Sequence, residues 1–512
     1  RRGLLGRREA VLCMHRPPSL EAVPEARRRL AYEELLLMQL AIALGRRWTA
    51  AHARAPILAG SPRIDERIRR RFPFRLTNAQ NRVIAEIAAD LARERPMTRL
   101  LQGDVGSGKT VVALYAALLA VANRRQCAIL APTEVLAAQH FNGIDRYLEG
   151  SRVRRCLLGG RGPRTGRARL LEAIADGAMD LVVGTQALLE EKVRFGDLGL
   201  VIVDEQHKFG VAQRATLRSK PKASAGSPAS FVPHYLVMTA TPIPRTLSMT
   251  VFGDLDVSVI DELPPGRSRV ATALVRPPDE ARAWLEVRRR IARGEQAYIV
   301  YPLVEESEAV DLKAAVQEAR QIGRTLLPGA TVGLLHGRMK NEEKQEVMGR
   351  FAAGRLDVLV TTTVIEVGVD VPNATVMVVQ HAERYGLSAL HQLRGRVGRG
   401  SRPGLCLLFA RGGGEAAARR LDVLCRTCDG FRIAEEDLRI RGPGELLGTR
   451  QHGWPEFRVA SLIEDVELLT AARDDAARLV AADPRLAAPE HAALRAELRR
   501  RFREKVAFID VA

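Results

Sequence analysis

The stretch LLQGDVGSGKT, residues 100–110, decides the fold of this 512-residue chain. An apolar segment from Thr98 precedes it and an apolar run over 111–122 follows it, which predicts a strand, a glycine loop and a helix. Because glycine lacks a Cβ atom, such a loop can curl until successive backbone N–H groups point at one anion, at the positive end of the following helix. The stretch fits the pattern G-x-x-x-x-G-K-[ST], and its context favours a phosphate-binding loop over an ordinary glycine-rich turn.

A loop of this kind binds a nucleoside triphosphate together with Mg²⁺. Its lysine, Lys109, would reach the β and γ phosphates, and its hydroxyl, Thr110, would reach the metal ion. We therefore predict ATP and Mg²⁺ as the cofactors. The loop residues predicted to bind the nucleotide are Gly103, Asp104, Val105, Gly106, Ser107, Gly108, Lys109 and Thr110.

Aromatic residues and a glutamine upstream of the loop suit the adenine base. Phe72 or Phe74 could stack on the ring while the amide of Gln80 pairs with its edge. The same residues also fit a helix over 78–93 that is capped by Thr77 and packs on a buried phenylalanine. Both interpretations stay open at this point.

Composition limits the classes of function. No uncharged apolar run approaches the roughly 18 residues that span a membrane, and the N-terminus lacks a secretory signal, so we expect a cytoplasmic location. Lysine and arginine outnumber the acids by 79 to 60; the net charge of +19 favours a polyanionic partner, although an arginine-rich composition gives the same excess. The 6 cysteines do not make a disulfide framework, and Cys425 with Cys428 form a lone C-x-x-C without a second pair to complete a zinc site.

Short apolar runs alternate with helical segments through most of the chain. Those at 128–131, 181–183, 200–203 and 234–238 each end in a small or polar loop, which is typical of a parallel sheet with both faces covered and its functional loops at the C-terminal edge. A second set over 296–409 has no phosphate-binding loop of its own. The pattern predicts an α/β fold with two parallel-sheet lobes.

Hydrolysis of a phosphoanhydride needs a held metal ion, an oriented water and positive charge at the transition state. Asp204 ends a buried strand and suits Mg²⁺, and its neighbour Glu205 suits the group that polarises the attacking water. In the second lobe, Arg396 and Arg399 stand three residues apart among glycines. They would meet the γ phosphate if the lobes close, and otherwise they belong to an Arg-Gly surface loop.

These stretches stand in the order found in superfamily 2 helicases, and the chain resembles the RecG family of bacterial branch-migration helicases more closely. The resemblance covers about 63–457. The helicase motifs are 103–110, DEQH at 204–207, TATPIPRT at 239–246, TTVIEVGVD at 362–370 and QLRGRVGR at 392–399. The stretches closest to the RecG family are DEQHKFGV at 204–211, VIDELPPGR at 259–267 and IRGPGELLGTRQ at 440–451.

The resemblance implies an ATP-dependent DNA helicase or translocase that acts on replication forks and Holliday junctions in recombination and repair. It also implies that the protein acts as a monomer and does not bind a membrane. Gln80 resembles the adenine-reading glutamine, and Thr110 and Asp204 would hold Mg²⁺. The positions that resemble the family's catalytic set are Lys109, Asp204, Glu205, Gln392, Arg396 and Arg399. Those that resemble its DNA-contacting and coupling segments are Pro132, Thr133, Gly184, Thr185, Thr239, Thr241, His336, Gly337, Thr362, Arg439, Arg441, Arg450 and Gln451.

The expected organisation is two RecA-like lobes flanked by helical regions. We expect a helical remnant over 1–62, the ATP-binding lobe over 63–262, the second lobe over 263–425 and a C-terminal helical hairpin region over 426–512. The family carries an oligonucleotide-binding wedge domain before the motor, and the first 60 or so residues are too few to hold it. If the chain starts at Arg1, the resemblance implies that ATPase activity survives and fork-specific unwinding does not. The sequence carries no signal for a contact with single-strand-binding protein.

Other classes fit less well. A repair-coupled translocase that pushes RNA polymerase shares much of this motor, but the stretch 442–451 and the absence of a polymerase-binding segment favour the RecG family. RNA helicases of the superfamily usually carry Asp-Glu-Ala-Asp and Ser-Ala-Thr, where this chain has DEQH at 204–207 and TAT at 239–241. A nucleotide-gated DNA-binding switch would be expected to lack Glu205 or the arginine pair.

Overall fold

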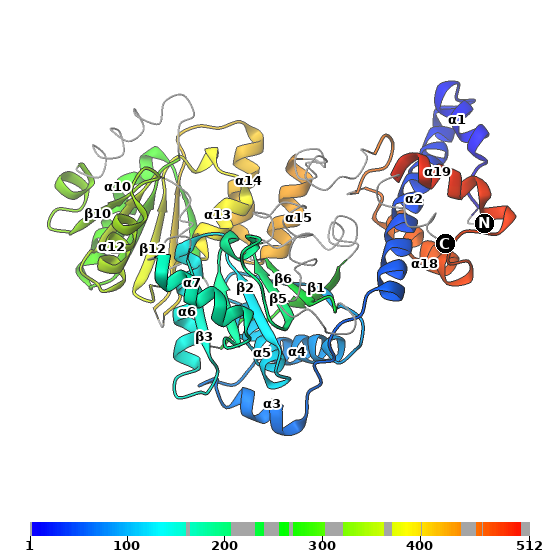
Figure 1. The fold of residues 1–512 in the computed structure, drawn as a ribbon. Helices are drawn as coiled ribbons and strands as arrows, with labels where there is room; N and C mark the ends of the chain where they lie inside the picture. The colour runs from blue at the N-terminus through cyan, green and yellow to red at the C-terminus, as the bar shows by residue number, and fades with distance from the viewer. Residues whose placement is uncertain are drawn as a thin grey trace.

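Two parallel sheets, each covered by helices, and a separate helical unit make up the molecule (Figure 1). The structure is a computed structural model. It describes residues 3–159, 164–205, 231–239, 255–265, 270–302, 321–362, 371–400, 402–441, 457–462 and 464–502. The predicted positions Thr241, Arg450 and Gln451 lie outside the described residues, and Arg441 is described only by its backbone.

The first lobe is built on a parallel sheet of seven strands in the order β3-β4-β2-β5-β6-β1-β7, within the described residues. Leu101 of β1 faces the core shared with the helices α4 and α5, whereas Leu100 faces a second core on the opposite side. A sheet buried on both faces explains why its strands are continuously apolar. The strands are β1 (Thr98–Gly103), β2 (Gln126–Leu130), β3 (Arg155–Leu158), β4 (Leu181–Gly184), β5 (Leu198–Asp204), β6 (His234–Thr239) and β7 (Asp256–Ile260). The helices are α3 (Pro62–Arg69), α4 (Asn78–Leu91), α5 (Lys109–Ala122), α6 (Glu134–Tyr147) and α7 (Arg164–Ala175).

The second lobe repeats this design with six parallel strands in the order β10-β11-β9-β12-β13-β8, again within the described residues. Trp284 packs on Phe409 with ring centroids 5.3 Å apart, which seals one face of this sheet. The strands are β8 (Ala271–Val275), β9 (Gln296–Val300), β10 (Val332–Leu335), β11 (Val358–Thr361), β12 (Ala374–Val379) and β13 (Leu405–Phe409). The helices are α10 (Glu280–Ala292), α12 (Asn341–Ala352), α13 (Leu387–Arg394), α14 (Glu415–Arg426) and α15 (Gly430–Arg441). The α/β class with two parallel-sheet lobes is confirmed.

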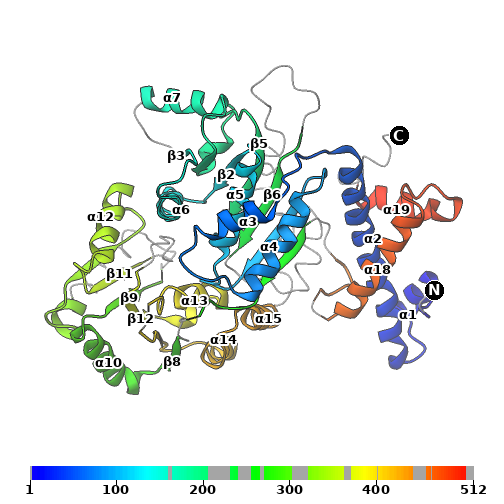
Figure 2. The same cartoon turned by 90° about the horizontal axis from the view of Figure 1, so that it is seen from below.

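The two ends of the chain meet in one helical unit, at the right of Figures 1 and 2. The long helix α2 (Val23–His52) shares a hydrophobic core with α18 (Val466–Ala482) and α19 (Ala492–Phe502), and α1 (Arg7–His15) packs on α2. The buried carboxylate of Glu34 on α2 accepts backbone hydrogen bonds from residues 458–460, at 3.0–3.2 Å. The N-terminal helix is therefore bound to the C-terminal helices, and the division of the chain at 62, 262 and 425 stays a prediction.

Strand order decides which loops come together. In the first lobe β6 lies between β5 and β1, so the loops after β5 and β1 open at the same edge of the sheet with one strand between them. That edge carries the glycine loop and the acidic pair, as expected for ligand sites of open parallel sheets. Among the described residues, no helix combines the length and the apolar content needed to cross a bilayer.

Candidate nucleotide site between the lobes

The glycine loop joins β1 to α5, as the sequence predicts. Gly106 and Gly108 have φ values of +78° and +87°, in the left-handed region that side-chain-bearing residues rarely adopt. A Cβ atom at Gly103 would lie 2.5 Å from Oγ of Ser107, so the start of the loop also has no room for a side chain. The positive φ values and the lack of space explain why glycine stands at these positions. The loop leads directly into the N-terminus of α5.

The Lys109 ammonium lies over the loop itself. Its Nζ donates to the backbone oxygens of Gly103 at 2.7 Å and Asp104 at 2.9 Å. Thr110 follows in the first turn of α5 and is exposed. Lys109 and Thr110 therefore both lie at the N-terminal end of α5, next to the loop. Their contacts with phosphate and Mg²⁺ stay predictions.

Asp204 ends β5 and is held by a histidine that the sequence analysis did not single out. His140 Nε2 lies 2.7 Å from Oδ2 of Asp204, and both side chains are largely buried. Burial by itself would raise the pKa of Asp204, but the hydrogen bond and charge of His140, with the charge of Lys109, lower the pKa below its ordinary value. The carboxylate is therefore ionised at neutral pH. His140 comes from α6, which follows β2, the strand adjacent to β5.

Glu205 has a strained backbone. Its φ of +53° is unusual for a residue with a side chain, and its N–H donates to the Met238 oxygen of β6 at 3.0 Å. Such strain persists only where the surroundings enforce it, and it concentrates at functional sites. The positive φ turns the backbone out of the extended path of β5 at Glu205, directly after Asp204.

The predicted adenine residue Gln80 contacts the glycine loop directly. Its Oε1 accepts from the backbone N–H of Thr77 at 3.0 Å, and its Nε2 donates to the Ser107 oxygen at 2.9 Å. A Cβ atom at Gly108 would lie 2.3 Å from Nε2. The helix cap is therefore confirmed, and Gln80 also fixes the loop; its contact with adenine stays a prediction.

The phenylalanines lie beside this cap. Phe72 is buried, whereas Phe74 is 46% exposed. Their rings are nearly parallel, with centroids 6.2 Å apart and an angle of 18°, and both meet the edge of Tyr147. Between the two candidates, Phe74 therefore offers the accessible ring face.

Arg396 of the second lobe lies in the electrostatic field of the acidic pair. Burial lowers its pKa to about 10, and the neighbouring Arg399 lowers it too, whereas the charges of Glu205 and Asp204 raise it. The charges of the two carboxylates in the first lobe therefore influence Arg396 of the second, and its guanidinium remains charged at neutral pH. The role of Arg396 and Arg399 at the γ phosphate stays a prediction. Arg399 donates from Nε to the Gly395 oxygen at 3.3 Å, and Gln392 lies on α13.

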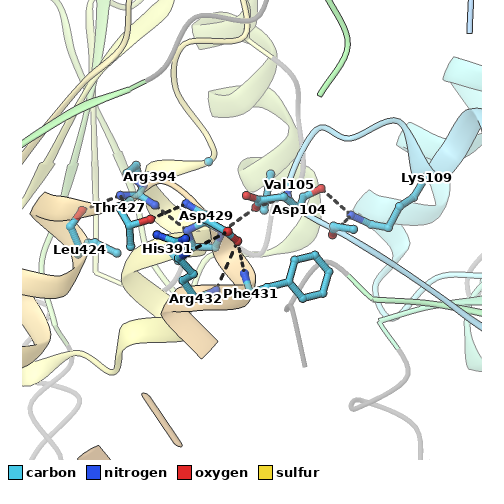
Figure 3. A network of polar contacts seen from close by, with 12 residues as sticks. Asp104, Val105, Lys109, His391, Arg394, Leu424, Thr427, Asp429, Phe431 and Arg432 are labelled. Carbon is cyan, nitrogen blue, oxygen red and sulfur yellow. Dashed lines mark hydrogen bonds and ion pairs between the residues drawn. The ribbon is translucent and has the colours of Figure 1, made fainter. Parts of the chain in front are cut away.

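The two lobes touch closely at Gly395. A Cβ atom there would lie 2.8 Å from Cβ of Val105, a residue of the glycine loop in the other lobe. Next to this contact, Nε2 of His391 lies 2.6 Å from Oδ1 of Asp104 (Figure 3). Burial would raise the pKa of Asp104, but the hydrogen bond from His391 lowers it below its ordinary value. Neither Gly395 nor His391 was predicted as a site residue, although Gly395 lies in the stretch 392–399 that drew attention to the arginines and His391 immediately precedes it.

Replacing Gly395 with alanine should push the lobes apart at the seam. Overpacking of this kind costs about 1–3 kcal/mol, which predicts a ~5-fold to 150-fold fall in ATP turnover. Nucleotide affinity should change little, because the loop and Lys109 remain. Steady-state turnover and binding of a fluorescent ADP would be measured beside Gly412→Ala, where an added Cβ meets nothing within 4 Å. Equal turnover in the two variants would contradict the tight seam.

The positions predicted to contact DNA follow the C-terminal ends of strands in both lobes. Thr133 caps α6, with Oγ1 accepting from the N–H of Leu136 at 3.4 Å, and Arg439 pairs with Glu436 on α15. The other positions lie at the C-terminal edge of a sheet, where they end or follow β2, β4 and β6 in the first lobe and β10 and β11 in the second. Arg439 does not lie at this edge. The positions at this edge are Pro132, Thr133, Gly184, Thr185, Thr239, His336, Gly337 and Thr362. Contact of these residues with DNA stays a prediction.

Family models match the two lobes in turn. The DEAD/DEAH box helicase model covers residues 77–250, and the helicase conserved C-terminal domain covers 281–401. Together with the seam, these matches define the class as a two-lobe helicase motor. The model of RecG domain 3, C-terminal, covers 427–511, and the RecG of Bacillus subtilis is 45% identical over 96% of this chain and 70% of its own length. The chain belongs to the RecG family of ATP-dependent DNA helicases.

Two further comparisons support membership of the RecG family. The ATP-dependent DNA helicase RecG of Synechocystis is 46% identical over 98% of this chain and 59% of its own length. A solved structure of RecG bound to a three-way DNA junction has 43% identity and a TM-score of 0.72, with 91% of this chain and 60% of that chain covered. The chain thus spans 59% to 70% of the length of these relatives.

Proposed function

We propose that this chain binds ATP with Mg²⁺ at the seam, hydrolyses it, and uses the cycle to drive branch migration of DNA at forks and junctions. The observation that supports hydrolysis best is that Arg396 of one lobe lies within the electrostatic influence of Asp204 and Glu205 of the other, whose charges act to raise its pKa. The names of the relatives indicate DNA as the partner, and the solved relative is bound to a three-way junction. A net charge of +19 suits such a polyanion.

The residues at the loop fit a bound Mg²⁺. Asp204 offers an ionised carboxylate and Thr110 offers a hydroxyl, and both are the hard oxygen donors that Mg²⁺ prefers. The metal ion would neutralise charge on the β and γ phosphates. Lys109 and the N–H groups at the start of α5 would hold the same phosphates from the protein side.

Each remaining residue has one task in hydrolysis. Glu205 would orient the attacking water and accept its proton, and Arg396 and Arg399 would stabilise the charge that develops on the γ phosphate. Because the arginines and the acids belong to different lobes, the set is complete only when the lobes are closed. Closure by ATP and reopening after hydrolysis would then move one lobe relative to the other.

The edge residues that resemble the DNA path suit a moving motor. Small hydroxyls and loop N–H groups, such as those at Thr133, Thr185 and Thr362, bind phosphates and do not read bases. Both lobes present such positions, so a change in the distance between the lobes would change the distance between their two sets of DNA-contacting residues. A bacterial chromosome lies in the cytoplasm, which is where this proposal puts the motor.

ATP turnover with different nucleic acids tests the proposal. Forked DNA, duplex DNA, single-stranded DNA and RNA would each be added to the wild-type chain and to Glu205→Gln. We expect DNA, and forked DNA most, to raise wild-type turnover, and we expect Glu205→Gln to be slower by about 10²-fold or more. Stimulation by RNA alone would overturn the assignment to DNA, and full turnover by Glu205→Gln would remove its role with water.

A further inference from the structure

A buried imidazole connects the glycine loop of the first lobe to a buried arginine of the second (Figure 3). Nη2 of Arg394 lies 2.9 Å from Nδ1 of His391, and Nε2 of His391 lies 2.6 Å from Oδ1 of Asp104. A guanidinium can only donate, so Nδ1 is the acceptor and the ring proton is on Nε2, which donates to the carboxylate. His391 and Arg394 are 4% and 3% exposed, so both residues are buried.

The other side of Arg394 holds the turn that leads into α15. Its Nη1 donates to the backbone oxygens of Leu424 at 2.7 Å and Thr427 at 2.9 Å. Oγ1 of Thr427 accepts from the N–H of Asp429 at 3.1 Å. Asp429 in turn caps α15, since its Oδ1 accepts from the N–H of Phe431 at 2.9 Å. An unbroken set of hydrogen bonds therefore runs from the glycine loop to the first turn of α15.

This path has little freedom to adjust. A buried guanidinium is costly unless its donors are paired, so Arg394 must follow the acceptors around it. Asp104 belongs to the loop whose backbone Lys109 contacts, with Nζ at 2.9 Å from the Asp104 oxygen. If Lys109 turns from these oxygens to phosphate, Asp104 is affected within the loop, and its partner His391 is the first residue outside the loop to be affected.

We propose that His391 and Arg394 are positioning residues that transmit the state of the glycine loop to the N-terminus of α15. The proposal rests on the proposed nucleotide site, but neither residue acts on the nucleotide. α15 opens the region matched by the C-terminal RecG model, which begins at residue 427. The C-terminal region would thus receive its signal from the ATP site through hydrogen bonds that cross from Asp104 of the first lobe to His391 and Arg394 of the second, in addition to movement of the second lobe as a whole.

Hydrogen exchange of the full chain tests this link without any need for helicase activity. Backbone amides of 427–441 would be followed alone, with ADP and Mg²⁺, and with adenylyl imidodiphosphate and Mg²⁺. In the wild-type chain we expect nucleotide to change their exchange by at least about threefold, while α10, which lies away from the path, stays unchanged. In His391→Ala the response over 427–441 should disappear.

Two variants separate transmission from simple loss of packing. His391→Gln should restore part of the response, because its amide has one acceptor and one donor for Arg394 and Asp104. Ser388→Ala removes a different contact from α13 to α15, the 3.1 Å hydrogen bond to Asp437, without touching the glycine loop. This control should keep the wild-type response to nucleotide. Loss of the response in Ser388→Ala as well, with no rescue in His391→Gln, would overturn the link.

Binding of a fluorescent ADP in the same samples distinguishes failure of the proposed nucleotide site from failure of the link alone. A wild-type chain that does not bind ADP would overturn the nucleotide site and this proposal with it. A wild-type chain that binds ADP without a change over 427–441 would overturn the link alone. The link would also be overturned if His391→Ala binds ADP and shows the wild-type change in exchange over 427–441.

Discussion

Arg396→Ala should lower ATP turnover by about 10³-fold or more while ATP still binds, because an arginine that meets the transferring phosphate contributes about this much. Arg396 is partly buried, and the charges of Glu205 and Asp204 of the other lobe act to raise its pKa against the effect of burial. In the proposed site this arginine would act on the developing charge rather than on ground-state binding. Turnover under saturating ATP and affinity for a fluorescent ADP would measure the two quantities separately.

A matched arginine controls for the loss of positive charge. Arg402 lies in the same lobe, and its exposed side chain donates to the Arg293 backbone oxygen at 3.4 Å. We expect Arg402→Ala to turn over ATP at the wild-type rate. If Arg396→Ala also stayed within about twofold of wild type, the seam would not be a catalytic site, since catalytic arginines have far larger effects.

Lys109→Ala should weaken nucleotide binding by about 100-fold and bring turnover below detection. The ammonium can make at least two charge-assisted contacts at this position, as shown by its two contacts with loop oxygens. Each such hydrogen bond is worth about 1.5–3 kcal/mol, and about 1.4 kcal/mol corresponds to a tenfold change in affinity. Equilibrium titration with a fluorescent ADP would measure the loss.

An exposed lysine in the same lobe supplies the comparison. Lys192 lies on the surface between β4 and β5, away from the loop, and Lys192→Ala should bind ADP as the wild-type chain does. Circular dichroism of both variants would verify that the helices and sheets are intact. Wild-type affinity in Lys109→Ala would mean that the nucleotide does not use this loop.

Several features of the site were readable from residue order because they depend on local chemistry. The glycines of 103–108 and Lys109 are required by the backbone of one short loop, and the structure shows positive φ at two of those glycines. Asp204 and Glu205 follow an apolar strand, so strand polarity alone puts them at the functional edge. Arg396 was predicted to face the other lobe from its spacing among glycines.

His140, His391 and Gly395 show what local chemistry could not predict. His140 meets Asp204 because β2 lies next to β5 in the sheet, which depends on strand order. His391 meets Asp104 across 287 residues of sequence. A side chain at Gly395 would have no room, because Val105 of the other lobe occupies the space next to it. Gln80, predicted to face adenine, also uses both ends of its amide within the protein.

Residue type and spacing over a few positions were enough to predict the two parallel-sheet lobes and the glycine loop, and to locate the acidic pair and the arginine pair in the chain. Tertiary structure alone decided three further matters: which histidines hold Asp204 and Asp104, how closely the lobes approach at Gly395, and that both ends of the chain share one helical unit. The physical reason is that hydrogen bonds and steric contacts between distant segments depend on where the whole chain places them, and no local pattern encodes that position.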